Sequence, residues 1–122
     1  SKKDFEKAEK CYLKRINFGG WKEEIWYSYY RLGILHLFNS DHYKAIYYFL
    51  EAYEHSPNRV ENLYFIMNFY RINNKRNLFL HYYNLIKEIL KKEIDRKDFL
   101  FMEMDKYSTK IEEEYQLFLN SK

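Results

Sequence analysis

The sequence predicts an all-α fold in which about six helices form a stack of helical hairpins, a fragment of a right-handed superhelical solenoid. Three observations support this prediction. Apolar residues recur three and four positions apart along six stretches of the 122-residue chain, which is the period of an amphipathic helix. Turn signals separate these stretches from one another. Small residues are rare in the chain, yet they occur at helical spacing near its centre, where they indicate close helix packing.

The first two predicted helices are separated by a glycine pair. Gly19 and Gly20 follow the first helix and favour a left-handed exit from it. A loop through Trp21 leads to the second helix, which is expected from about Lys22 to Phe38. The apolar residues that mark the first helix are Phe5, Ala8, Tyr12 and Ile16.

The third and fourth helices are predicted from polar residues that can cap them. Asn39 or Ser40 can cap the third helix, with Asp41 in its first turn, where a carboxylate interacts favourably with the helix dipole. Ser56 is expected to cap the fourth helix. Pro57 then takes the first helical position, where its missing N–H costs nothing, and the helix continues to about Arg71, before a turn at Asn73 and Asn74.

The last two helices are predicted on either side of a polar connection. The fifth is expected from Lys75 to about Lys92, and the sixth from about Glu103 to Leu119. Between them, residues 98–102 form an apolar run that is too short for its periodicity to decide between helix and strand. The sixth helix carries its apolar residues on one side: Tyr107, Ile111, Tyr115 and Phe118.

Composition and charge fit one globular domain. Hydrophobic residues make up 47% of the chain and charged residues 32%, a balance that excludes a disordered segment. No apolar run reaches the roughly 18 residues of a membrane span, so no membrane partner is expected. The 21 basic and 18 acidic side chains are mixed along the chain, so neither a nucleic-acid-binding stripe nor a polybasic membrane patch is expected. The single cysteine, Cys11, indicates a reducing, cytoplasmic location and is expected to be a buried small residue.

The centre of the chain matches the tetratricopeptide pattern. In this 34-residue helical hairpin, a Leu-Gly pair, an Ala-x3-Phe segment and a proline follow one another in fixed order. Small residues would let the second helix of the hairpin approach the first, whereas larger side chains would hold the two helices apart. The residues predicted to pack the repeat are Leu32, Gly33, Ala45, Phe49, Ala52 and Pro57.

One helical-repeat domain is predicted over residues 1–122, and the chain is expected to be an excised segment of a longer protein. Within it we expect, in chain order, the second half of a truncated repeat, a best-matching repeat, a degenerate repeat and a closing helix. The degenerate repeat has Met67 and Phe79 where glycine and alanine are expected. The four parts cover residues 1–20, 26–59, 60–93 and 98–122.

A narrower resemblance rests on the junctions between the predicted helices. The segment AEKCYLKRINFGGWKEEIWYSYYRLG is similar to the tetratricopeptide region that follows the catalytic domain in family 2 glycosyltransferases, with its GGW-x-EE turn and WYS helix start. The likeness continues through KAIYYFLEAYEHSPNRVENLYFIMNFYRINN and FLFMEMDKYSTKIEEEY, so that it covers about residues 8–115. The resemblance implies a non-catalytic accessory module of a glycosyltransferase-like parent protein, and it assigns no catalytic residue.

Acidic and histidine residues give little support for catalysis or metal binding. Glu103 and Asp105 could hold a divalent cation, but no parallel sheet precedes them, so a first helical turn is predicted instead. Glu23–Glu24 and Glu112–Glu114 are expected on solvated faces or in early turns. The histidines lack the spacing of a zinc site. No catalytic residue, metal or cofactor is therefore expected.

Tyrosines and arginines on the first helix of each hairpin are the candidate binding residues. In tetratricopeptide stacks this helix lines a concave groove, and tyrosine and arginine are enriched at binding centres. The sequence leaves open whether the following helix covers these residues. Trp21 and Trp26 are expected to fix their turn rather than to bind a sugar. The residues whose register directs them to the groove are Tyr27, Tyr30, Arg31, Ile34, Tyr64, Asn68 and Arg71.

The expected function is contact with another protein, or the positioning of substrate, by a module that is not itself an enzyme. The expected partner is a protein or peptide segment in the concave groove, or the missing catalytic domain. A second hypothesis is an RNA-binding helical repeat, because Arg71, Lys75 and Arg76 lie close together in the sequence. A third is that the chain forms part of a sugar-transfer active site that the catalytic domain completes.

Overall fold

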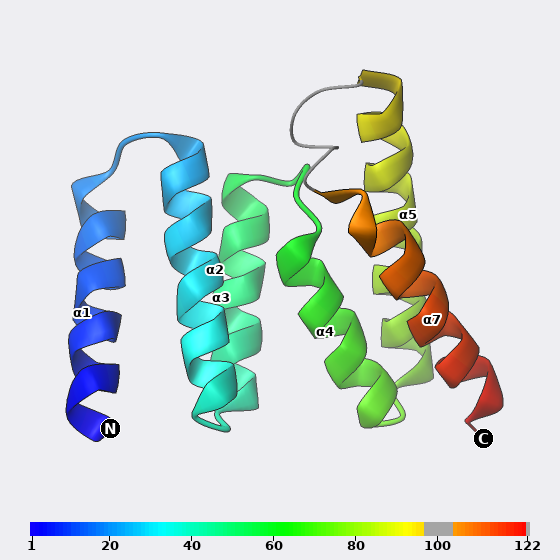
Figure 1. Ribbon diagram of the computed structural model, residues 1–122, viewed down its shortest axis with the longest axis horizontal. Helices are drawn as coiled ribbons and strands as arrows, with labels where there is room; N and C mark the ends of the chain where they lie inside the picture. Colours follow the sequence, from blue (N-terminus) through cyan, green and yellow to red (C-terminus); the bar gives the residue numbers. More distant parts are fainter. Residues whose placement is uncertain (97–103, 122) are drawn as a thin grey trace. The chain divides into compact units, whose positions relative to one another are not determined.

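The computed structural model describes residues 1–96 and 104–121, which form six α-helices and no strand (Figure 1). The predicted all-α class is confirmed for this part of the chain. The apolar run at 98–102 lies outside the described residues. The helices are α1 (Lys2–Phe18), α2 (Lys22–Phe38), α3 (His42–His55), α4 (Glu61–Ile72), α5 (Arg76–Arg96) and α7 (Lys106–Asn120).

The six helices belong to two compact units. Unit 1 is Ser1–Pro57 and contains α1, α2 and α3. Unit 2 is Asn58–Lys122 and contains α4, α5 and α7. Among the described residues, no helix is both long enough and apolar enough to cross a membrane.

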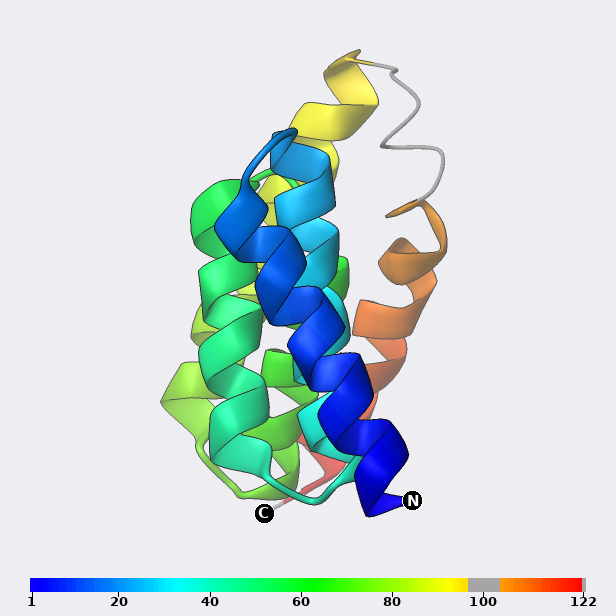
Figure 2. The ribbon, with the colours of Figure 1, turned by 90° about the vertical axis from the view of Figure 1, so that its left-hand side faces the viewer.

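In unit 1, α2 is the central helix, because it packs against both α1 and α3. The three helices run in alternating directions, and Figure 2 shows α1 from its outer side. The core lies between α2 and α3, whereas α1 contributes no buried residue. Of the six residues predicted to pack the repeat, five are buried in this core: Leu32, Gly33, Ala45, Phe49 and Ala52.

Gly33 shows why a residue without a side chain stands in the middle of α2. A Cβ atom built on Gly33 would overlap the ring of Phe49 on α3. The ring therefore lies directly on the α2 backbone, which brings the two helices close together. Ala45 and Ala52, on the same side of α3 as Phe49, are at most 1% exposed and leave room for this approach.

The turn between α1 and α2 has the predicted glycine exit. Gly19 and Gly20 have φ angles of 83° and 118°, which L residues with a Cβ rarely adopt. The Gly19 N–H donates to the carbonyl oxygen of Ile16 at 3.1 Å and closes the last turn of α1. Across the turn, Arg15 forms an ion pair with Glu24. The glycines and the ion pair together fix how α1 leads into α2.

The cap of α3 differs by one or two residues from the prediction. Asp41 is the N-cap, because its Oδ1 accepts a hydrogen bond from the Lys44 N–H at 3.2 Å. Asn39 instead ends α2, and Ser40 has a left-handed φ of 61° in the turn between the helices. The prediction that Asn39 or Ser40 caps α3 was therefore wrong. The short turn needs both residues, so the next acceptor along the chain becomes the cap.

Ser56 and Pro57 do not begin the fourth helix, so this prediction was also wrong. Ser56 is the C-cap of α3, and its N–H donates to the Ala52 carbonyl oxygen at 3.0 Å. Its hydroxyl donates to Glu23 of α2 at 3.5 Å. Pro57 lies in an exposed turn rather than at a first helical position. The backbone of Ser56 is therefore used to end one helix and is not free to start another.

The start of α4 at Glu61 depends on a buried ion pair instead. Arg59 Nε donates to Glu61 Oε1 at 3.1 Å, and the same oxygen accepts the Val60 N–H at 3.2 Å. Arg59 and Glu61 are 6% and 9% exposed. The start of α4 thus has no side-chain cap, and the Glu61 carboxylate instead accepts from Arg59 and from the N–H of the N-cap residue Val60.

In unit 2, α4 and α5 form an antiparallel pair and α7 packs against both (Figure 1). The large residues of the degenerate repeat, Met67 and Phe79, are both fully buried. Phe79 stacks on Phe118 of α7 with ring centroids 4.3 Å apart. Aromatic stacking between helices therefore fills unit 2, whereas small residues allow close packing in unit 1.

Candidate functional site

Three candidate groove residues of α4 lie together beneath α7. Asn68 Nδ2 donates to Glu114 Oε1 at 2.8 Å, and Arg71 forms an ion pair with the other carboxylate oxygen. The Tyr64 ring meets the Tyr107 ring edge to face, with centroids 5.5 Å apart. Tyr64, Asn68 and Arg71 thus share one face of α4, and a segment of the same chain occupies that face.

Glu114 is the acceptor at the centre of this contact. Its side chain is 9% exposed and that of Arg71 is 20% exposed, so the pair is largely shielded from water. Burial, followed by the negative charges of Glu114 and Glu113, raises the pKa of Tyr64 above its ordinary value.

The prediction that Glu112–Glu114 are all solvated was wrong for Glu114. Glu112 and Glu113 are exposed, whereas Glu114 is buried. The sequence contained a signal for this difference, since Glu114 follows Ile111 by three positions and precedes Phe118 by four. That spacing places it on the apolar face of α7.

On α2, the candidates Tyr27, Tyr30 and Arg31 have different surroundings. Tyr27 is 52% exposed. Tyr30 is half-buried and stacks on Trp26 with ring centroids 5.0 Å apart. Arg31 Nε donates to the Tyr12 hydroxyl of α1 at 3.4 Å, a bond that raises the pKa of the guanidinium. Arg31 is therefore held toward α1 while Tyr27 is available to solvent.

The candidate residues form two separate sets, one in each unit. Ile34, the remaining α2 candidate, is half-buried. Helix α7 covers the α4 set. The sequence had left open whether another helix covers the candidate residues. The α2 set presents at least one large exposed ring. Whether either set binds a separate partner stays a prediction.

A polar contact between α1 and α2 was not found by sequence reasoning. His36 Nε2 lies 2.7 Å from Glu9 Oε2, and the His36 side chain is 4% exposed. Its ring stacks on Tyr48 and meets Phe5 edge to face. Nδ1 of His36 is buried without a hydrogen-bond partner among the described residues.

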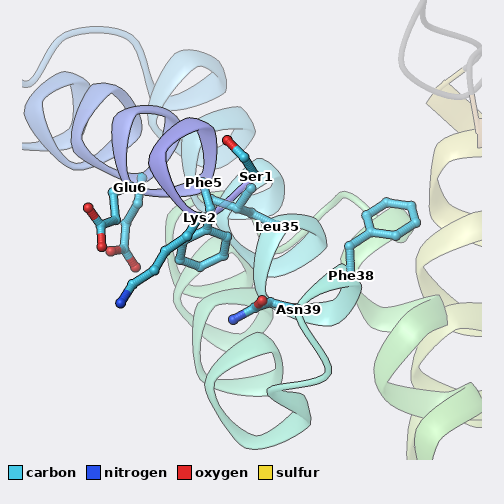
Figure 3. A pocket seen from close by; sticks show the side chains of 8 residues that line it. Ser1, Lys2, Phe5, Glu6, Leu35, Phe38 and Asn39 are labelled. Carbon is cyan, nitrogen blue, oxygen red and sulfur yellow. The ribbon is translucent and has the colours of Figure 1, made fainter.

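Beside this contact, the beginning of α1 and the end of α2 enclose an open depression of about 700 Å³ (Figure 3). Figure 3 shows that its lining comes only from these two helix ends and the residue that follows α2. The lining mixes aromatic and aliphatic side chains with charges of both signs: Ser1, Lys2, Phe5, Glu6, Glu9, Leu35, Phe38 and Asn39. Because neither charge predominates, the depression indicates no particular ligand class.

Two further sequence expectations for unit 1 were wrong. Cys11 is exposed rather than buried, because α1 packs only one side against α2 and Cys11 falls outside that side. Trp21 is 78% exposed and does not fix the turn, whereas Trp26 is buried at 3% exposure. The glycine backbone and the Arg15–Glu24 ion pair hold the turn without Trp21.

The described residues contain no cluster of three or more His, Cys, Asp or Glu side chains that could hold a metal ion. Asp105 is exposed, and Glu103 lies outside the part of the chain that the structure describes. Of the cations considered for RNA binding, Arg71 is paired with Glu114, and the Arg76 guanidinium lies over the Phe118 ring at 4.1 Å. Both arginines are thus engaged in contacts with α7.

Comparison with known proteins adds no relative to this description. The chain matches no protein-family model, and it matches no curated protein and no solved structure at a significant level.

Proposed function

We propose that this chain is a non-catalytic helical-repeat module of the tetratricopeptide kind that binds a protein segment through the α2 face, while its own helix α7 occupies the α4 face. In a longer parent protein similar to family 2 glycosyltransferases, it would contact a partner or position substrate beside the catalytic domain. A peptide segment, or the catalytic domain itself, is the proposed partner.

One observation carries the proposal. Tyr64, Asn68 and Arg71, which the helical register predicts to face the groove, contact the helix α7 in the structure. Asn68 and Arg71 together bind both oxygens of the Glu114 carboxylate, and Tyr64 contacts an aromatic ring of the same segment. A directional donor pair beside a tyrosine is a combination that suits recognition of a protein segment. The α4 face therefore has the chemistry of a peptide-binding face, and α7 is its intramolecular occupant.

The α2 face is the one we propose for a separate partner. Tyr30 lies 34 positions before Tyr64, which is one repeat length, and Tyr27 is exposed one turn earlier. Tyrosine provides a large contact area and loses little conformational entropy when it is ordered. A partner segment would cover Tyr27 and the exposed edge of Tyr30.

The resemblance to glycosyltransferases rests on motifs at the junctions between helices, and residues of these motifs contact other residues of this chain. Gly19 and Gly20 supply the backbone of the α1–α2 turn, and Glu24 pairs with Arg15 across it. Arg59 and Glu61 pair at the start of α4. These contacts support a scaffold role for the motifs, in keeping with an accessory module rather than an active site.

A photo-crosslinking experiment tests the proposal. We would replace Tyr27 with p-benzoylphenylalanine in the parent protein, and use Tyr43, which is 83% exposed on α3, as the matched control position. Crosslinking to a polypeptide from Tyr27 and not from Tyr43 is expected. With the identified partner in purified form, Tyr30→Ala should then weaken binding by about 2 kcal/mol, roughly 30-fold.

Equal crosslinking from both positions would contradict a binding face on α2. Turnover of a nucleotide sugar by the isolated chain would contradict the non-catalytic assignment. Melting curves of Tyr30→Ala serve as the control for folding, because Tyr30 also stacks on Trp26. If Tyr30→Ala lowers the melting temperature, the binding measurement would be made with Tyr27→Ala instead, because the Tyr27 side chain is 52% exposed.

A further inference from the structure

The outer face of α1 carries a stripe of four lysines. Lys3, Lys7, Lys10 and Lys14 are all exposed, and their spacing of four, three and four residues places them along one side of a helix. At 1.5 Å per residue the stripe extends over about 16 Å. It lies on the side of α1 away from Tyr12, which contacts α2.

Contacts within the chain do not explain this stripe. None of the four lysines forms an ion pair with an acid in residues 1–96 or 104–121. The nearest flanking acid on one side, Asp4, is engaged with the hydroxyl of Ser1. Like charges three and four positions apart weaken a helix slightly. Glu6 lies four positions before Lys10, the favourable order for an ion pair, but it forms no ion pair with a lysine among the described residues.

Two exposed aromatic rings stand at the end of the stripe. Phe18 follows Lys14 by one turn and is 84% exposed, and Trp21 follows the glycine pair and is 78% exposed. Neither ring has a stacking or cation–π contact within the described residues. Phe18 comes immediately before the Gly19–Gly20 turn and Trp21 immediately after it, so both residues lie at the C-terminal end of α1. A basic strip thus ends in an apolar tip.

We propose that this face, the lysine stripe with Phe18 and Trp21, docks onto an anionic phospholipid surface. Lysine is a compact, hydrated point charge, which suits many mobile phosphates better than one directional site. Each lysine near such a surface raises binding by about fivefold. Tryptophan prefers the interface between headgroups and hydrocarbon. A charge signal combined with an apolar signal is what stable membrane attachment requires.

The arrangement of the rings favours a lipid surface over a nucleic acid. Proteins that bind single strands place aromatic rings along the basic track, so that successive bases stack while phosphates are neutralised. Here both exposed rings gather at one end of the stripe. A flat surface can meet the whole stripe while the tip inserts. This proposal uses α1 and Trp21 of the following turn, and it does not depend on the partner-binding face of α2.

Vesicle flotation tests the proposal. The whole chain would be mixed with phosphatidylcholine vesicles that contain, or lack, about one third phosphatidylserine, an anionic lipid. Binding is expected only to the anionic vesicles and should fall steeply as salt is raised. Changing the four lysines together to glutamine (K3Q, K7Q, K10Q, K14Q) should lower the partition coefficient by several hundredfold.

The matched control removes the same charge elsewhere. Lys44, Lys75, Lys91 and Lys92 are exposed lysines on other helices or turns, and their joint change to glutamine should leave binding within a few-fold of wild type. A second variant, Phe18→Ser with Trp21→Ser, keeps all charges and should still lose at least tenfold in binding. Both sets of changes are at exposed positions, so the melting temperature should be nearly unchanged.

Three outcomes would overturn the proposal. Binding to neutral vesicles at equal strength would show that charge is not involved. Equal losses in the stripe variant and in the control variant would show that position does not matter. Tighter binding to single-stranded RNA, with a log–log salt slope near −2.8 for four phosphates and loss in the stripe variant, would assign the face to nucleic acid instead.

Discussion

At the scale of single residues, Ala45 and Ala52 are small because α3 must approach α2. Both are at most 1% exposed, and the Phe49 ring on the same helix rests against Gly33. A chain rich in large aromatic residues therefore uses a small residue where helix backbones come close.

Ala45→Leu and Ala52→Leu should each lower the free energy of unfolding by roughly 1–3 kcal/mol, because an added side chain must push α2 and α3 apart. Urea denaturation measures the loss. Glu54→Leu, at an exposed position of α3, is the control and should stay within about 0.5 kcal/mol of wild type. Leucine variants that unfold like the control would disprove the close-packing role.

Glu114→Gln should destabilise the chain by about 1–3 kcal/mol, because Arg71 would keep a largely shielded charge without its counterion. Glu113→Gln removes an equal charge from the exposed neighbouring position and is the matched control. Thermal and urea unfolding of the two variants give the comparison. If both variants unfold alike, Glu114 is not the residue that fastens α7 to α4.

At the scale of helices, periodicity predicted which segments are helical, and capping rules were less reliable about their ends. The second helix has the predicted bounds, Lys22–Phe38. The fourth begins at Glu61 rather than at Pro57, because the Ser56 N–H completes α3 and the Arg59–Glu61 pair starts α4. A local sequence rule cannot decide which of two helices will use a backbone group that either could take.

The candidate residues show the same limit of sequence reasoning. Register placed Tyr64, Asn68 and Arg71 on one face of α4, and their shared contact with α7 agrees with that geometry. The sequence could not show that Glu114 would occupy the face, since that pairing joins residues more than 40 positions apart. His36 with Glu9 was missed for a similar reason, because no spacing rule links two helices.

The contact between α5 and α7 should make stability sensitive to alkali. Burial, and then a hydrogen bond from the Tyr83 hydroxyl to Glu112 at 2.7 Å, raise the pKa of Tyr83 above its ordinary value of 10.0. The unfolded chain would thus lose this proton at a lower pH than the folded chain. Stability should be unaffected by this group below about pH 9, and should fall above about pH 10 by up to 1.4 kcal/mol per pH unit.

Urea unfolding between neutral and alkaline pH measures this dependence, with Tyr83→Phe as the test variant. Its alkaline slope should be smaller than that of wild type, although the variant also loses the bond to Glu112 and is less stable at neutral pH. Tyr43→Phe, at a position that is 83% exposed, is the control and should keep the full slope. An unchanged slope in Tyr83→Phe would show that this tyrosine does not resist ionisation in the folded chain.

At the scale of the whole molecule, the two units reach a packed core by different means. Unit 1 brings α2 and α3 together through Gly33 and small residues on α3. Unit 2 has no such residues at the corresponding positions and fills its interior with stacked rings, such as Phe79 on Phe118. In neither unit do the described His, Cys, Asp and Glu side chains form a cluster of three or more that could hold a metal ion.

The last prediction follows from this construction and concerns the whole chain. The isolated protein should neither hydrolyse nor transfer sugar from a nucleotide sugar, and Mn²⁺ should leave its melting temperature unchanged. A ligand that binds the native state must raise the melting temperature, so a thermal shift titration is a direct measurement. Asp105→Asn is the control, since Asp105 is the described member of the acidic pair considered for a metal. A saturable shift with Mn²⁺ that Asp105→Asn abolishes would establish a metal site and contradict the scaffold role.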